Sequence, residues 1–249
     1  LRDKKDSYWT SFYEAEKAHL PDRSITKPGL GSLRVVVIGG PISEVMALSQ
    51  FELILDASGS MKYTHQKVDG RLKIDVAKDV MAQIIQDLPE NVQVALRVFG
   101  HRIREGAKGD CQDSDLVFPM QKMDKPRLLR KVRDIEALGT TPLAYSLRLA
   151  GEDVRHLPEP KHIILVPDGK EECGGNPPEV AEGLVRSGVN VQVDVVGFDL
   201  ADAATKRDME SVAKITGGLY ADAKSTRELL QAIQQALAAP YDVLDAAGK

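Results

Sequence analysis

Hydrophobic positions follow two alternating periods along most of the chain. Short apolar runs predict buried strands, and stripes with three- and four-residue spacing predict amphipathic helices. The predicted strands are residues 51–55, 92–99, 116–120, 162–166, 189–196 and 218–221. The predicted helices are residues 74–88, 128–138, 142–156, 178–187, 205–216 and 226–238. This alternation predicts an α/β domain with a mostly parallel sheet and helices on both faces.

The N-terminal fifth of the chain does not follow this pattern. Apolar and aromatic residues from Trp9 onward fall near helical spacing and predict a short amphipathic helix, followed by a strand over residues 33–38. We therefore divide the chain into an N-terminal appendage (1–48), a main domain (49–239) and a C-terminal tail (240–249).

Composition narrows the class of protein. The chain has 249 residues, of which 43% are hydrophobic, enough for a sizeable core. Its net charge of −4 and the lack of a concentrated basic patch argue against nucleic-acid binding. The four cations within residues 127–133 are expected on the solvated face of a helix. The sequence contains no apolar run of about 18 residues, so no membrane-spanning helix is predicted. No signal peptide is visible, and the first residue, Leu1, indicates a trimmed or mature form.

The two cysteines, Cys111 and Cys173, are too few for an all-cysteine zinc site. Both lie in segments rich in Gly and Asp, whereas free cysteines prefer the interior. A disulfide in an oxidising, extracytoplasmic compartment is one interpretation. Two unpaired thiols in a cytoplasmic protein fit these facts almost equally well.

Oxygen-bearing side chains gather where predicted strands end or helices begin. Asp56, Ser58 and Ser60 directly follow the strand 51–55, Thr141 precedes a helix, and Asp168 follows the strand 162–166. Ligands in parallel sheets bind at the carboxyl ends of strands where the strand order reverses. If these two strands are neighbours there, Asp56 and Asp168 lie close together.

Each of these features also has an ordinary explanation. A serine or threonine before a helix is often an N-cap, and Asp-Gly after a strand is usually a turn. The order of the three segments along the chain nevertheless favours a metal site. Carboxylate and hydroxyl oxygens are ligands that Mg²⁺, Mn²⁺ or Ca²⁺ prefers.

The combination Asp-x-Ser-x-Ser, Gly-x-Thr-Pro and Asp-Gly resembles the metal-ion-dependent adhesion site of von Willebrand factor A domains over about residues 50–238. The stretches 98–102, 109–111, 168–175 and 195–199 are similar to a bacterial subgroup. The resemblance implies a three-layer, Rossmann-like fold whose mostly parallel sheet has six strands, with residues 116–120 as its antiparallel edge strand.

The same resemblance implies that Ser58 and Ser60 bind the ion directly. Thr141 would bind it directly or through water, and Asp56 and Asp168 mainly through waters. Pro167 departs from the pattern, since Ser or Thr is common there. Relatives often carry two further cysteines near the positions of Pro178 and Val212; if those two pair with each other, Cys111 and Cys173 are the remaining pair.

The implied function is a non-enzymatic protein-interaction module. A bound Mg²⁺, or alternatively Mn²⁺ or Ca²⁺, would be completed by an Asp or Glu of a partner protein, and loops 62–70, 102–114 and 170–177 would select that partner.

Two alternatives remain. A phosphatase of the haloacid-dehalogenase type also begins with an aspartate after a strand, but it needs a second aspartate where this chain has Ser58. A scaffold with a purely structural metal site is the other. His101 lacks a clear nucleophile partner and is expected to be structural.

Overall fold

The computed structural model describes residues 50–238, apart from 64, 159 and 160. The helix and strand expected within residues 1–48 and the tail 240–249 lie outside these residues. Among the described helices, none combines the length and the hydrophobicity needed to cross a bilayer.

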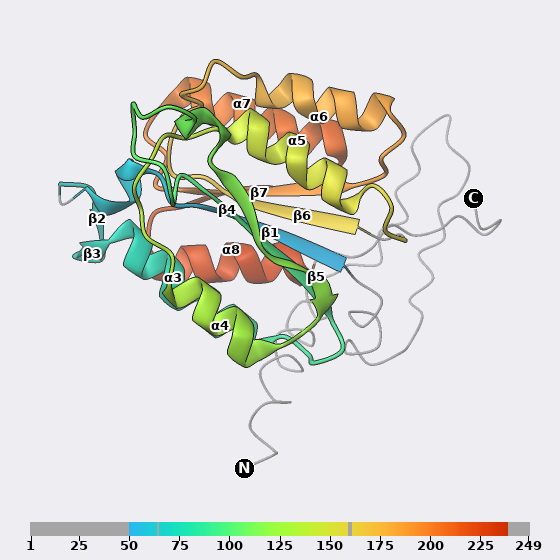
Figure 1. Cartoon of the computed structure of the whole chain (residues 1–249), viewed down its shortest axis with the longest axis horizontal. Coiled ribbons are helices and arrows are strands. Elements are labelled where there is room, and N and C mark those ends of the chain that lie inside the picture. The colour runs from blue at the N-terminus through green and yellow to red at the C-terminus, as the bar shows by residue number, and fades with distance from the viewer. Residues whose placement is uncertain (1–49, 64, 159–160, 239–249) are drawn as a thin grey trace, which may run out of the picture. The chain divides into compact units, whose positions relative to one another are not determined.

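A six-stranded sheet forms the centre of the described domain (Figure 1). Its strand order is β5-β4-β1-β6-β7-β8, and only β4 and β5 pair antiparallel. The strands are β1 (Gln50–Asp56), β4 (Gln93–Phe99), β5 (Ser114–Lys122), β6 (Lys161–Val166), β7 (Gln192–Phe198) and β8 (Tyr220–Ala223). The predicted α/β class and the antiparallel edge strand are confirmed, although β5 is longer than expected and β7 begins three residues later.

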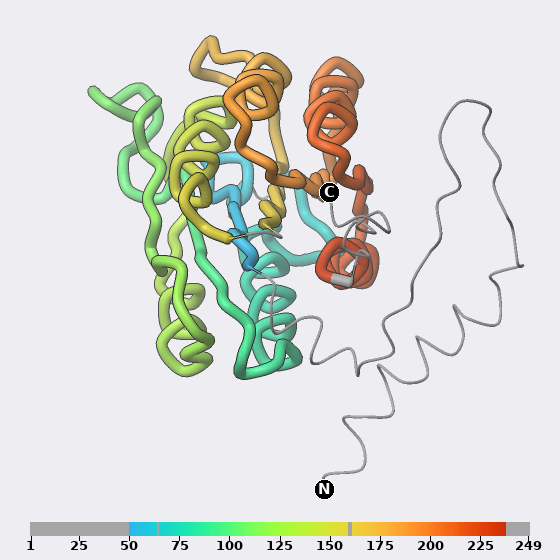
Figure 2. The backbone as a smooth tube through the Cα atoms, turned by 90° about the vertical axis from the view of Figure 1, so that its right-hand side faces the viewer, coloured from blue at the N-terminus to red at the C-terminus, as the bar shows by residue number. Residues whose placement is uncertain are grey.

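Among the described residues, six α-helices cover the two faces of this sheet. Figures 1 and 2 both show helices on either side of it. On one face lie α3 (Lys73–Asp87), α4 (Lys125–Arg133) and α8 (Thr226–Ala238). On the other lie α5 (Leu143–Val154), α6 (Pro177–Arg186) and α7 (Ala203–Thr216). The arrangement is the expected three-layer, Rossmann-like fold.

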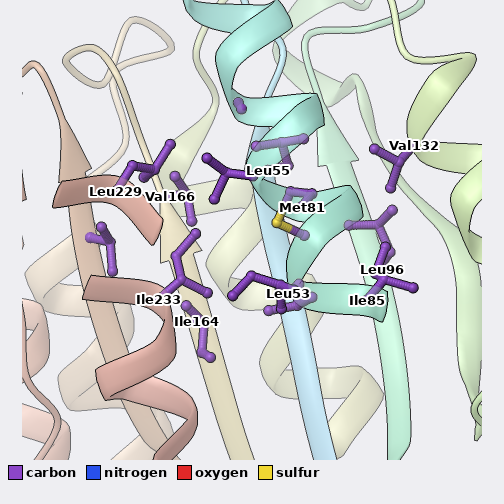
Figure 3. Packing of buried hydrophobic residues seen from close by; sticks show 14 of the residues in the cluster. Leu53, Leu55, Met81, Ile85, Leu96, Val132, Ile164, Val166, Leu229 and Ile233 are labelled. Carbon is purple, nitrogen blue, oxygen red and sulfur yellow. The ribbon is translucent and has the colours of Figure 1, made fainter. Parts of the chain in front are cut away.

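The core is divided into two layers by the alternation of side chains along each strand. In β1, Leu53 and Leu55 pack with Met81 of α3 (Figure 3). Ile54 instead belongs to the cluster under α5 to α7. Each fully buried side chain of this kind contributes about 1.5–3 kcal/mol. Because both faces are covered, β1 is buried along its whole length. The strand ends that follow are therefore held on a rigid scaffold.

The helix predicted over residues 128–138 is wrong in its bounds. The helix begins at Lys125, because Oδ1 of Asp124 accepts a hydrogen bond from the backbone N of Arg127 at 3.1 Å, and it ends at Arg133. The backbone N of Leu138 instead donates to carbonyl oxygens beyond the ends of β1 and β4. Residues 134–142 thus form a connection along the carboxyl ends of the strands. The four cations of residues 127–133 are exposed, as expected.

A hairpin occupies part of the expected loop 62–70. It consists of β2 (Lys67–Val68) and β3 (Arg71–Leu72), which pair antiparallel. Its two turn residues, Asp69 and Gly70, have φ angles of 52° and 76°, which are typical of the tight turn that Asp-Gly favours. The hairpin leads directly into α3.

Candidate metal site

The strand order reverses between β1 and β6, since the chain leaves β1 toward β4 and leaves β6 toward β7 (Figure 1). Asp56 is the last residue of β1, and Asp168 follows the end of β6. The backbone N of Asp168 donates a hydrogen bond to Oδ2 of Asp56 at 3.1 Å. The two aspartates therefore meet at the switch point of the sheet, where such folds bind ligands.

Two hydroxyls and one carboxylate oxygen form a compact triangle beside this contact. Oγ of Ser58 lies 3.0 Å from Oγ of Ser60, and Oδ1 of Asp168 lies 2.5 Å from Oγ of Ser60 and 3.5 Å from Oγ of Ser58. Ligands on neighbouring corners of a Mg²⁺ octahedron are separated by about 3 Å, given metal–oxygen distances of about 2.1 Å. The 3.0 Å between the two serine hydroxyls fits this spacing, and Oδ1 of Asp168 lies within hydrogen-bond distance of both.

Asp56 holds the backbone of this site and is fully buried. Its Oδ1 accepts a hydrogen bond from the backbone N of Ser58 at 2.8 Å, while Oδ2 accepts the one from Asp168. Burial, and then the negative charge of Asp168, raise the pKa of Asp56 well above its usual range. Asp56 thus fixes the two loops from within, and both of its oxygens have protein partners.

Close backbone packing brings the third loop to the site. Gly139 O accepts a hydrogen bond from the backbone N of Gly59 at 2.7 Å. Gly100 adopts a φ of +68°, and a Cβ there would lie 2.7 Å from the carbonyl oxygen of Thr140. Only glycine accommodates both the left-handed backbone and this approach.

Thr141 is buried at the edge of the same space, with 2% exposure. A Cβ on Gly169 would lie 3.7 Å from Oγ of Ser60 and 3.9 Å from Oγ1 of Thr141, so the two hydroxyls flank the same glycine. The neighbouring Thr140 has a buried Oγ1 without a hydrogen-bond partner. All five residues predicted for the site are thus gathered at one end of the sheet.

The ordinary N-cap explanations do not apply to these hydroxyls. Pro142 occupies the N-cap position of α5, and Ser58 makes no side-chain cap hydrogen bond to the short 3₁₀ helix Gly59–Lys62. The α5 terminus is instead satisfied by Glu171, whose Oε2 accepts a hydrogen bond from the backbone N of Ala144 at 2.8 Å. Glu171 lies in loop 170–177, which was expected to select a partner, and its capping role was not predicted from the sequence.

A second residue that sequence reasoning missed is Lys73, the first residue of α3. Its Nζ lies 3.3 Å from Oδ2 of Asp168 and 3.2 Å from Oδ2 of Asp199. The available signal was its spacing, because Lys73 precedes Ala77 by four residues and so falls on the buried stripe of the helix. A cation on an apolar stripe predicts a buried partner.

The rim of the site is tied by a disulfide between Cys111 and Cys173, whose Cα atoms are 5.5 Å apart. It joins loops 102–114 and 170–177, as the predicted pairing implied. Tyr63 also lies at the rim: burial, and then the charges of Glu105, Glu172 and Asp168, raise the pKa of its hydroxyl.

His101 lies further along the same rim, with Nδ1 3.7 Å from Asp113 and Nε2 3.6 Å from Asp115. Burial lowers the pKa of His101, which favours the neutral imidazole. Nε of Arg102 lies 3.3 Å from Oδ1 of Asp113 and also pairs with Asp115, so the guanidinium of Arg102 already neutralises part of the charge of these carboxylates. This network supports the structural role expected for His101.

Comparison with known proteins identifies the family. The model of the von Willebrand factor type A domain matches residues 52–171. The uncharacterized protein YwmC of Bacillus subtilis is 31% identical over 192 residues, which cover 75% of this chain and 82% of that protein.

Two solved structures share the fold. The pilus adhesin SpaC of Lactobacillus rhamnosus GG has a TM-score of 0.60 at 16% identity, over 76% of this chain and 30% of SpaC. Proximal thread matrix protein 1 of the mussel byssus, whose metal-ion-dependent adhesion site is occupied by zinc, has a TM-score of 0.54 at 17% identity, over 76% of this chain and 45% of that protein. The fold, the order of the site motifs and the bacterial relative lead to one conclusion: this chain belongs to the von Willebrand factor A domain family.

Proposed function

We propose that this domain is a divalent-cation-dependent protein-interaction module. Ser58, Ser60 and Thr141 would hold the ion, supported by Asp56 and Asp168, and an acidic residue of a partner protein would complete its coordination. The observation that carries this proposal is the triangle of the Ser58, Ser60 and Asp168 oxygens at the switch point, with sides of 2.5–3.5 Å.

The donor set explains why a partner carboxylate would be favoured. Hydroxyls are neutral ligands, so they leave most of the charge of the ion uncompensated. Asp168 lies within reach of both serine hydroxyls and would orient their lone pairs toward a common cation. The ion itself would supply an electropositive position for an incoming carboxylate. We propose Mg²⁺ as the resident ion because these oxygen ligands are hard; Mn²⁺ and Ca²⁺ accept the same donors.

The position of Asp56 argues against a phosphatase. A nucleophilic aspartate needs an accessible oxygen, whereas Asp56 is fully buried and both its oxygens accept backbone hydrogen bonds. A general acid two residues later is also replaced by Ser58. We expect no turnover of a generic phosphomonoester with Mg²⁺, and a turnover that disappears in Asp56→Asn would overturn this assignment.

Calorimetry with Mg²⁺ and with Mn²⁺ tests the ion site. The double variant Ser58→Ala, Ser60→Ala should lose at least about tenfold in affinity, because each hydroxyl ligand contributes on the order of 1 kcal/mol or more. Ser211→Ala is the matched control, since its hydroxyl bonds only to the carbonyl of Arg207 on α7. Equal heats from the wild type and the double variant would contradict the site.

A second measurement separates an interaction site from a purely structural ion. Water-proton relaxation by bound Mn²⁺ reports how many water molecules the ion retains. An open site should give enhanced relaxation that falls when acetate is added, because acetate displaces a bound water. A closed structural ion would give little enhancement and no response to acetate, while chelation would still lower the melting temperature.

We further propose that the domain works outside the cytoplasm. The disulfide between Cys111 and Cys173 is of the kind that persists in oxidising compartments. A pilus adhesin also shares the fold, which is consistent with a surface role. Fractionation of the native organism should recover the protein outside the cytoplasm with both cysteines oxidised. Recovery in the cytoplasm with free thiols would contradict this location.

A further inference from the structure

Lys73 places a buried positive charge directly beside the candidate metal site. Its side chain is only 2% exposed, although lysines are almost never fully buried unless they are paired. Its two partners, Asp168 and Asp199, follow the ends of β6 and β7. The ammonium thus reaches from the start of α3 to the carboxyl ends of two strands.

Asp168 links this ammonium to the hydroxyls of the site. Its Oδ1 contacts Ser60 and Ser58, while its Oδ2 faces Nζ of Lys73 at 3.3 Å. A cation held by the two hydroxyls would therefore share one carboxylate with Lys73. Two positive charges that share one buried carboxylate repel each other, and the repulsion is stronger in the low-dielectric interior than in water.

We propose that Lys73 is a resident counter-cation that sets how tightly the site holds a divalent ion. In the metal-free protein its charge neutralises Asp168 and holds that carboxylate toward the serine hydroxyls. In the loaded protein the same charge opposes the ion and weakens its binding. This inference rests on the proposed metal site and names a determinant of its affinity that lies outside the ligand set.

The sum of the charges around the metal site affects how an acidic partner would bind. Lys73 offsets Asp168, and Asp199 is 41% exposed and therefore better screened by solvent. Asp56 remains as the other buried carboxylate of the site. At full charge the ion and Lys73 balance the three carboxylates, so the solvent screening of Asp199 leaves a small positive excess that an acidic partner would neutralise. Lys73 would thereby make ion retention depend on the partner.

The test measures the affinity of the full chain for Mn²⁺ in the wild type and in Lys73→Met, Lys73→Gln and Lys73→Arg. Lys73→Met removes the charge with little change in volume, and Lys73→Gln can still donate a hydrogen bond to Asp168 if the Met variant does not fold. Both neutral variants should bind Mn²⁺ at least about tenfold more tightly, because the repulsion described above is removed. Lys73→Arg, which keeps the charge, should stay near the wild-type affinity.

Melting temperatures supply a readout independent of affinity. In EDTA the neutral variants should melt below the wild type, because Asp168 loses its buried partner, and Mn²⁺ should raise their melting temperature by more than that of the wild type. The matched control is Lys78→Met, also on α3, whose Nζ bonds to the carbonyl of Ile135 instead of a carboxylate. It should leave Mn²⁺ affinity unchanged.

The possible outcomes separate this inference from the proposed function. If the wild type binds Mn²⁺ and the neutral variants bind it equally or less tightly, Lys73 is only a structural partner of Asp168 and the inference is wrong. If only the neutral variants bind Mn²⁺, the inference stands and the proposed function of the natural chain fails. If none binds Mn²⁺, both are overturned.

Discussion

Glu171 caps the helix that follows Thr141: its Oε2 accepts a hydrogen bond from the backbone N of Ala144 at 2.8 Å. The other carboxylate oxygen, Oε1, accepts one from the backbone N of Cys173 at 2.8 Å. A single side chain thus joins the loop after β6 to the start of α5. The contact also sets the position of Thr141 relative to Asp168.

We expect Glu171→Ala to destabilise the fold by about 1–2 kcal/mol, the usual effect of losing a helix cap. Because the Asp168 loop would no longer be held against α5, Mn²⁺ affinity should fall as well. Urea unfolding and calorimetry measure the two effects. Glu172→Ala is the control for stability, since the bond to Thr141 O is made by the backbone N of residue 172 and is kept in the variant. Equal losses in both variants would contradict the capping role.

Gly100 is expected to tolerate no side chain. In Gly100→Ala the left-handed backbone and the contact with Thr140 O should together destabilise the fold by about 2–4 kcal/mol. Gly70→Ala is the matched control, because Gly70 has a φ of +76° with nothing within 4 Å of its Cβ position. It should lose only about 1 kcal/mol from the backbone. Similar midpoints of urea unfolding for the two variants would argue against the close packing of this loop.

The disulfide should stabilise the fold by about 2–4 kcal/mol, since it closes a long loop between residues 62 positions apart in the sequence. The double variant Cys111→Ser, Cys173→Ser should unfold at correspondingly lower urea concentration. A titration of the denatured, unreduced wild type should find no free thiol. Two thiols per chain would refute the bridge.

Glu52 should make the stability of the fold fall as pH rises. It is fully buried on β1, where its Oε1 accepts a hydrogen bond from Nε of Arg97 at 3.1 Å. Burial, followed by the charge of Asp153, raises the pKa of Glu52 to about 8, against the lowering effect of Arg97. Between these two values Glu52 keeps its proton in the folded protein, whereas in the unfolded chain, where its pKa is 4.5, it has released the proton. The contribution of Glu52 to the free energy of unfolding is therefore fully present below pH 4.5 and is lost progressively as the pH rises to about 8.

Glu52→Gln removes the titratable group and should flatten the pH dependence of the free energy of unfolding. Relative to the variant, the wild type should lose about 1–3 kcal/mol of unfolding free energy between about pH 5 and about pH 8.5. Glu182→Gln is the control, since that side chain is exposed on α6 and pairs with Arg186 one turn away. Parallel pH profiles of the wild type and Glu52→Gln would refute the prediction.

The sheet and the position of the site were predictable because buried strands and amphipathic helices give strong periodic signals. The rule for switch points then predicts that Asp56 and Asp168 lie close together. The end of α4 was not predictable in this way. Val132, Ile135 and Leu138 continue a helical spacing, but Leu138 donates its backbone N–H to Ala57 and Gly100 carbonyls outside any helix. Tertiary hydrogen bonds decided where this helix ends.

The roles of charged residues that act through tertiary contacts were not predictable from the sequence either. Asp199 resembles an ordinary surface charge after a strand, and the place of Lys73 on the apolar stripe of its helix does not say which carboxylate is its partner. Only the fold brings the side chain of Lys73 to the residues that follow β6 and β7. The Asp69-Gly70 turn does have a local signal, although residues 62–70 were expected only as a loop.

The pairing of Lys73 with Asp199 also bears on where the domain can be truncated. The backbone N of Phe198 donates to Pro167 O at 2.8 Å, so β7 supports the loop that carries Asp168. A fragment that stopped at residue 171, where the family match ends, would retain every candidate ligand and still lack this support. Truncation designs should therefore extend through β7 and Asp199 at least.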